Sequence, residues 1–164
     1  MRPLVVTPLV LSLAAALAAC GKPSTEGGNQ AAAPAPAPEL TMEQMKQAQA
    51  ALPAPYNAAD LENGKAKFAF CSSCHTINPG GPTMTGPNLY GVAGTKVAAI
   101  PGYNFSDALK AQTFTWDAAH LDAWIADPKA LAPGTKMTYF GMKDAKDRTD
   151  LVAYLLVNAP PAAK

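Results

Sequence analysis

The chain has few of the residues that metal sites and hydrolytic sites usually require. Its 164 residues include three cysteines and two histidines, and its formal net charge is only +1. This balance leaves no basic stripe of the kind that nucleic-acid binding demands, so we expect no nucleic-acid partner. No Ser/His/Asp arrangement or paired-carboxylate site is visible, which argues against an ordinary hydrolase. Internal repeats and the alternating pattern of a β-strand are also missing.

An apolar run near the start is short for a membrane span. Arg2 precedes residues 4–17, which are rich in Leu, Val and Ala, and this is the pattern of a secretory signal. Residues 17–20 resemble a bacterial lipoprotein box, in which the cysteine receives a diacylglyceryl group. We therefore predict a signal peptide over residues 1–19 and a lipid anchor on Cys20, at the periplasmic side of a bacterial membrane. The alternative is an ordinary signal cleaved nearby, with an incidental Cys20.

The segment from residue 20 to residue 59 is predicted to be a flexible tether. Residues 21–39 are rich in Gly, Pro, Ala and Ser and show no apolar period. Thr41 and Gln44 form a capping-box pattern before a short predicted helix over 42–52, which either stays in the linker or docks on the domain. As a random coil, residues 21–59 would reach roughly 35 Å.

A mainly α domain is predicted over residues 60–158, with a disordered tail over 159–164. Three helices are expected, with bounds at about 61–72, 117–127 and 145–158. Asp60 is suited to cap the first helix, and Pro128 must end the second. The stretch between these two helices is crowded with Gly and Pro. Its length makes sense if something other than the chain fills the core.

Two of the three cysteines form the pattern of covalent haem attachment. Residues 71–75 read Cys-Ser-Ser-Cys-His, which is C-x-x-C-H. Each thiol would form a thioether with one vinyl group of the same porphyrin, and the next histidine would fall under the ring centre. We therefore predict one covalently bound haem c, attached at Cys71 and Cys74, with His75 as a ligand of the iron.

Three other interpretations of this motif fit less well. A redox-active cysteine pair belongs in a βαβ unit, whereas these cysteines follow a helical pattern. A structural zinc site needs about four Cys or His ligands, and the domain offers only the motif and His120. A disulfide between Cys71 and Cys74 would leave the adjacent histidine and the loop-rich core unexplained.

The residues alone leave the opposite axial position open. His120 reads as a partly exposed residue at the start of the second helix. Met84, Met137 and Met142 are the thioether candidates in the domain, and any single methionine can also be core filler.

The chain resembles class I cytochrome c, the group of mitochondrial cytochrome c and related bacterial proteins. The resemblance covers about residues 60–157 and is carried, in order, by CSSCH, TGPNLYGVAGTK (85–96), PGYNFSDA (101–108), TW (115–116), DPKALAPGTKM (127–137) and DRTDLVAYL (147–155). It implies the cytochrome c fold, with three to five helices wrapped around one haem and long irregular loops.

The resemblance also implies roles for single residues. Met137 would be the second axial ligand, and the Pro87 carbonyl would accept a hydrogen bond from His75. Trp116 and Thr135 would lie at the haem propionates, with Thr135 toward the methionine side. The first helix, with Gly64 and Phe68, would cross the last helix at Leu151 and Tyr154.

Four positions depart from the pattern of the family. Thr95 stands in place of an arginine near the inner propionate, and Phe105 in place of a propionate-binding tyrosine. Leu109 replaces an asparagine of the methionine-side water pocket, and Trp124 replaces a tyrosine near the methionine sulfur. We expect altered propionate ionisation, a drier pocket and a shifted reduction potential. The lysine-rich face of the family is also thinned, although Lys129, Lys136 and Lys143 remain as candidate docking charges.

The resulting functional hypothesis is a single-electron carrier that is not an enzyme, with a domain that is monomeric. By resemblance, its redox partners would include a cytochrome bc complex, a terminal oxidase or a photosynthetic reaction centre. One alternative is a haem protein with an open iron position that binds a gas or reduces peroxide. Another is a fixed electron relay within a larger complex.

Overall fold

The computed structural model describes residues 39–158. The predicted signal peptide, Cys20, most of the tether and the tail over 159–164 lie outside the described residues. The described part is mainly helical, with six α-helices and one 3-10 turn, and five of these helices, α2 to α6, lie in the predicted domain, within the three to five expected. The three longer helices of the domain were predicted; the other two in it, α3 (Asp107–Lys110) and α5 (Pro128–Leu131), are four-residue helices. None of the described helices combines the length and the apolar character needed to cross a bilayer.

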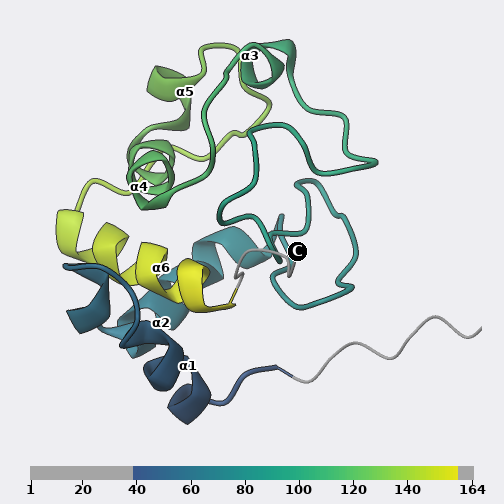
Figure 1. The fold of residues 1–164 in the computed structure, drawn as a ribbon. Coiled ribbons are helices and arrows are strands. Elements are labelled where there is room, and N and C mark those ends of the chain that lie inside the picture. Colours follow the sequence, from purple (N-terminus) through teal and green to yellow (C-terminus); the bar gives the residue numbers. More distant parts are fainter. Residues whose placement is uncertain (1–38, 159–164) are drawn as a thin grey trace, which may run out of the picture. The chain divides into compact units, whose positions relative to one another are not determined.

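Helices α2 (Leu61–Ser72) and α6 (Ala145–Asn158) cross each other and organise the fold (Figure 1). The Asp60 side chain accepts hydrogen bonds from the first backbone N–H groups of α2, so the predicted N-cap is confirmed. Gly64 packs against the backbone of Asp150 and Cβ of Tyr154. The rings of Phe68 and Tyr154 have centroids 5.7 Å apart. The predicted crossing is thus present at this glycine.

Helix α4 (Ala118–Ala126) forms the second layer, above α6 in Figure 1. The predicted bounds of this helix are confirmed: it ends at its C-cap Asp127, before Pro128, and it starts after Asp117, which caps it by accepting from the backbone N–H of His120. Pro128 then takes the first position of α5, where its missing N–H is tolerated. Leu121 and Ile125 are the buried residues of α4, so this helix carries its apolar side into the core.

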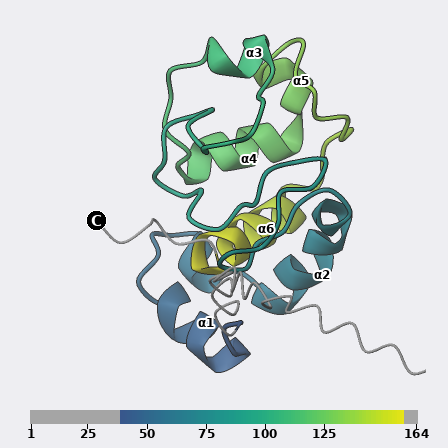
Figure 2. The ribbon, with the colours of Figure 1, turned by 90° about the vertical axis from the view of Figure 1, so that its right-hand side faces the viewer.

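Helix α1 (Met42–Gln49) docks on the domain, which is the second of the two possibilities for this segment. Figures 1 and 2 both place α1 beside α6, and its Met45 is only 4% exposed. The Asn158 side-chain amide donates to Met45 Sδ at 3.1 Å. Residues 42–59 are therefore packed on the domain, and a tether reach computed to residue 59 is too long.

The helix is also shorter than the predicted 42–52, and the reason lies in its last residue. The capping box of Thr41 and Gln44 is present as predicted, but the helix stops at Gln49. The buried Gln49 side chain donates to the carbonyls of Tyr56 and Ala59, at 2.9 and 2.7 Å. These bonds turn the chain back on itself through the 3-10 turn Tyr56–Ala58.

The segment from residue 73 to residue 106 contains no helix and no strand in the described structure. An isolated bridge joins Lys96 to Thr115, and two backbone hydrogen bonds of 2.8 Å join Trp116 to Gly94 and Thr95. The irregular stretch is thereby tied to the start of α4. It forms one wall of a cavity whose other walls come from the helices and from residues 135–140.

Candidate functional site

The C-x-x-C-H motif stands where α2 ends. Cys71 lies in the last turn of the helix, and its carbonyl accepts the backbone N–H groups of Cys74 and His75, at 3.0 and 2.9 Å. The turn continues in helical sense, so all three side chains line the same cavity. The two thiols are not joined in a disulfide. Burial, with a smaller contribution from Cys74, raises the pKa of the Cys71 thiol to about 11, so this sulfur is protonated at neutral pH before any attachment.

The imidazole of His75 is held in one orientation. Its Nδ1 lies 2.8 Å from the Pro87 carbonyl oxygen, which can only accept, so Nδ1 carries the proton. Burial lowers the pKa of His75, although the Pro87 carbonyl opposes this effect, and the ring is therefore neutral at pH 7. A neutral ring with its proton on Nδ1 leaves the Nε2 lone pair free to bind a metal.

Gly86 makes room for this ring, and sequence reasoning did not single it out. A Cβ on Gly86 would overlap His75 Cε1 and lie 2.6 Å from Nδ1. The backbone N–H of Gly86 also donates to the Cys74 carbonyl at 2.8 Å, which fastens this loop to the motif. The only signal in the sequence was the place of Gly86 before Pro87 in the family-like segment.

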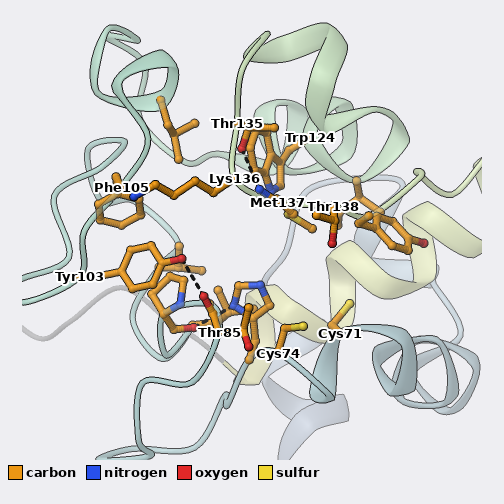
Figure 3. A pocket seen from close by; sticks show the side chains of 18 of the residues that line it. Cys71, Cys74, Thr85, Tyr103, Phe105, Trp124, Thr135, Lys136, Met137 and Thr138 are labelled. Atoms are coloured by element: carbon orange, nitrogen blue, oxygen red, sulfur yellow. Dashed lines mark hydrogen bonds between the residues drawn. The ribbon is translucent and has the colours of Figure 1, made fainter.

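A cavity of about 420 Å³ opens next to the motif. Its walls are largely apolar, and they include Leu89, Val92, Ile100, Leu109, Trp116, Leu121, Trp124, Ile125 and Leu155. Figure 3 shows Cys71 and Cys74 along one side of this cavity and Met137 across from them. This apolar cavity has two thiols and a neutral imidazole at one wall and a thioether at another. These are the groups that a covalently held haem requires.

The methionine loop (residues 132–137) brings Met137 to the cavity. The Thr135 N–H donates to the Ala132 carbonyl at 3.0 Å, and Gly134 has a positive φ of 92°, so the chain turns sharply there. The Met137 N–H then donates to Thr135 Oγ1 at 3.2 Å (Figure 3). Met137 and Thr135 both line the cavity.

The other two thioether candidates lie elsewhere. Met84 is 45% exposed and Met142 is buried in the core, and neither lines the cavity. His120 is also outside it: its ring stacks on Phe114 with centroids 4.3 Å apart, and Nδ1 lies 2.8 Å from Asp117 Oδ1. His120 is thus a partly exposed helix residue, as its position in the sequence indicated.

A further set of contacts fastens the segment that follows Met137. The Met142 N–H donates to the Ile125 carbonyl at 2.8 Å, which joins this segment to α4. Arg148 of α6 donates to the carbonyls of Met142 and Lys143, at 3.0 and 2.9 Å, and its Nε donates to Asp122 at 3.0 Å. Sequence reasoning missed Arg148, because nothing local marks its carbonyl partners.

Comparisons with known proteins agree with this geometry. The family model described as Cytochrome c matches residues 61–158. The chain belongs to the cytochrome c family. It is 42% identical to cytochrome c2 of Rhodomicrobium vannielii over 100 residues, which cover 61% of this chain and 80% of that protein. It is also 42% identical to a cytochrome c2 of Rhodoplanes tepidamans over 105 residues, 64% of this chain and 98% of the other.

A solved structure extends the likeness to the fold. Cytochrome cH from Methylobacterium extorquens matches with a TM-score of 0.56 and 45% identity, over 59% of this chain and 97% of that one. The mainly helical cytochrome c fold is thereby confirmed. As a cytochrome c, the chain is an electron carrier with one covalently bound haem c, and Cys71 and Cys74 fit its attachment motif.

The departures from the family pattern have distinct surroundings in this cytochrome c. Phe105, Leu109 and Trp124 line the cavity, whereas Thr95 does not, and its hydroxyl donates to the Val92 carbonyl at 2.7 Å. Trp124 packs edge-on against Trp116 with centroids 5.6 Å apart. Leu109 and Trp124 thus place apolar side chains in the cavity wall at the two positions where the family pattern has an asparagine and a tyrosine.

Tyr103 is a cavity residue that sequence reasoning did not consider. Its ring packs edge-on against Phe105 with centroids 4.7 Å apart, and its hydroxyl donates to the Thr85 carbonyl at 2.8 Å (Figure 3). The phenol thus ties the loop around residue 103 to the loop that carries Gly86 and Pro87. Tyr103 supplies a hydroxyl beside the position where Phe105 has none.

Proposed function

We propose that this cytochrome c carries single electrons with His75 and Met137 as the two axial ligands of its haem iron. The observation that carries the proposal is the place of Met137: within residues 39–158 it is the one methionine that lines the cavity. The bound iron alternates between ferric and ferrous states, and a His/Met ligand pair raises its reduction potential. With His75 and Met137 both bound to the iron, no position would be open to a substrate, so the proposed role is that of a carrier and not of an enzyme.

Other residues have supporting roles in this proposal. Pro87 holds the His75 ring through the 2.8 Å contact and so aims Nε2 into the cavity. Thr135 orients the methionine loop by accepting the Met137 N–H. Trp116 lines the cavity, and we propose that its indole N–H donates to a haem propionate, with Thr135 nearby.

We further propose that the protein is held at the periplasmic side of a bacterial membrane by a lipid on Cys20. The support is the lipobox-like sequence at residues 17–20 and the Ala/Pro-rich segment that follows it. A domain on such a tether can exchange electrons in turn with a cytochrome bc complex and a terminal oxidase or reaction centre. The mass of the N-terminal peptide after extraction from membranes tests the anchor, and an unmodified Cys20 would contradict it.

Carbon monoxide tests the closed iron site. We expect the visible spectrum of the reduced protein to stay unchanged at neutral pH when carbon monoxide is added. Met137→Leu keeps a side chain of similar volume but removes the thioether, and this variant should bind carbon monoxide promptly. Met84→Leu is the matched control, because Met84 is outside the cavity, and it should behave like the wild type.

Two results would contradict the proposal. A prompt spectral change in the wild type would mean an open iron position and would favour gas binding or peroxide chemistry. An unreactive Met137→Leu variant would assign the second ligand to another residue. Stoichiometric co-purification with a large complex after gentle solubilisation would instead favour a fixed relay over a mobile carrier.

A further inference from the structure

Two phenylalanines stand at the edge of the haem cavity with most of their surface in solvent. Phe140 is 88% exposed and Phe70 is 64% exposed, and both line the cavity. Phe70 immediately precedes Cys71 in α2, and Phe140 follows Met137 by three residues. The two rings therefore belong to the two chain segments that carry the haem-binding residues. An electron that leaves by the cavity edge passes near them.

The cavity rim, defined as the exposed residues among those that line it, is almost free of charge. Its members are Phe70, Ser73, Thr85, Lys136, Thr138 and Phe140. Lys136 is the one charged side chain in this rim, and its Nζ donates to the Asn104 carbonyl at 2.8 Å. The other polar groups of the rim are neutral hydroxyls.

The two other lysines expected as docking charges contribute little to this rim. Neither Lys129 nor Lys143 lines the cavity. Lys143 Nζ donates to the Ala126 carbonyl at 3.0 Å and lies 3.7 Å from the Asp127 carboxylate, which compensates its charge. An acidic partner would thus find Lys136 as its only charged contact among the six rim residues. Contacts between charges within this rim therefore contribute little to docking.

We propose that the cavity rim docks a redox protein through Phe70 and Phe140, against an apolar and uncharged face of that partner. This inference rests on the proposed function, because a partner must approach the cavity edge to exchange electrons with the haem. Aromatic side chains at the centre of an interface supply most of its binding energy, and each can bury about 150–250 Å². Two exposed rings beside neutral hydroxyls match an apolar partner surface, whereas an acidic surface would lose its hydration and gain only the ion pair with Lys136 in this rim.

The test uses two small blue-copper proteins as probes, one with an apolar, uncharged docking face and one with an acidic docking face. Stopped-flow absorbance gives the second-order rate of electron transfer from the reduced holoprotein to each probe over a range of salt concentrations. We expect the apolar probe to react faster. We also expect its rate to change by less than about twofold with salt, since little charge is screened at this face.

Matched variants separate the rim from the rest of the surface. Phe140→Ser and Phe70→Ser should each slow the reaction with the apolar probe by roughly tenfold, which corresponds to about 1.4 kcal/mol. Both side chains are mainly in solvent, so their removal leaves the core intact. Tyr90→Ser is the control: Tyr90 is 43% exposed but does not line the cavity, and its loss should leave the rate unchanged.

Several results would overturn the inference. Unchanged rates in both phenylalanine variants would remove the rings from docking, and a faster, strongly salt-dependent reaction with the acidic probe would assign docking to charge. If the variants instead lose binding to phosphatidylcholine vesicles while electron transfer is unchanged, the rings contact lipid. A prior titration with small redox reagents tests the proposed function separately from the docking surface. A chain that cannot be reversibly reduced contradicts the proposed function, whereas a reversible chain with unaffected variants contradicts only the docking surface.

Discussion

Replacing Gly64 with alanine should destabilise the fold, although the same exchange normally stabilises a helix. Alanine is favoured over glycine in a helix interior by about 0.8–1.0 kcal/mol. At this position, however, a Cβ would overlap the carbonyl oxygen of Asp150 and lie 2.8 Å from Tyr154 Cβ. The first of these atoms belongs to the backbone of α6, so a side-chain rotation cannot relieve the overlap. Helices α2 and α6 would have to move apart.

The expected size of the effect follows from these two opposing contributions. Overpacking costs about 1–3 kcal/mol, and a backbone contact belongs at the upper end of that range. After the gain in helix propensity of about 1 kcal/mol, the free energy of unfolding should fall by about 2 kcal/mol. For a domain of this size, that corresponds to a melting temperature lower by about 8 °C. Separation of the helices would also weaken the contact between Phe68 and Tyr154.

Urea denaturation of the holoprotein, followed by circular dichroism, measures this change. Ala66→Gly is the matched control, because Ala66 is exposed on the same helix and should lose only the propensity of about 1 kcal/mol. Gly64→Ala and Ala66→Gly, which are opposite exchanges on one helix, should then both destabilise the protein. If Gly64→Ala were as stable as the wild type or more stable, the close crossing of α2 and α6 would be wrong.

Two further predictions concern the same helix pair. Burial alone would raise the pKa of Asp150, but hydrogen bonds from Lys146 and Asn63 hold it below its ordinary value. The ionised group thus stabilises the fold above its unfolded pKa of about 4, and this is lost as pH falls through the lowered folded pKa. Urea midpoints should therefore fall less on acidification in Asp150→Asn than in the wild type, and parallel curves would contradict this. Met45→Ala should lower the free energy of unfolding by about 2 kcal/mol, because Met45 is only 4% exposed. The control Gln47→Ala removes an exposed side chain of the same helix and should leave the free energy of unfolding unchanged. An equally small loss in both variants would mean that α1 does not dock.

The helix boundaries that could be predicted from the sequence are those set by local chemistry. A carboxylate at Asp60 or Asp117 satisfies N–H groups two or three residues ahead, and Pro128 excludes a helical residue before it. These signals lie within a few residues of the element they define. The contact between His75 and Pro87 was predicted from the resemblance to class I cytochrome c, in which the two residues occur in a fixed order.

The features that could not be predicted depend on atoms far apart in the sequence. Docking of α1 requires α6, more than a hundred residues later, to offer Asn158 to Met45. The role of Gly86 appears only when the His75 ring is in place, and Arg148 acts through carbonyls that no pattern marks. The hydroxyl contact of Thr95 shows the same limit, because the resemblance concerns only its place near a propionate and does not mark the Val92 carbonyl that accepts from it.

The cavity links the stability of the fold to its function. Its volume is about 420 Å³, and its walls come from α2, the irregular segment, α4, the methionine loop and α6. A haem held here would cover the apolar walls, and each Å² of apolar surface removed from water contributes roughly 25 cal/mol to stability. Since a whole domain is stable by only about 5–15 kcal/mol, the packing of the haem against these walls would supply a substantial share of the total. The covalent links at Cys71 and Cys74 therefore retain a group on which the fold itself depends, and the long loops of the sequence are the part of the chain that packs around it.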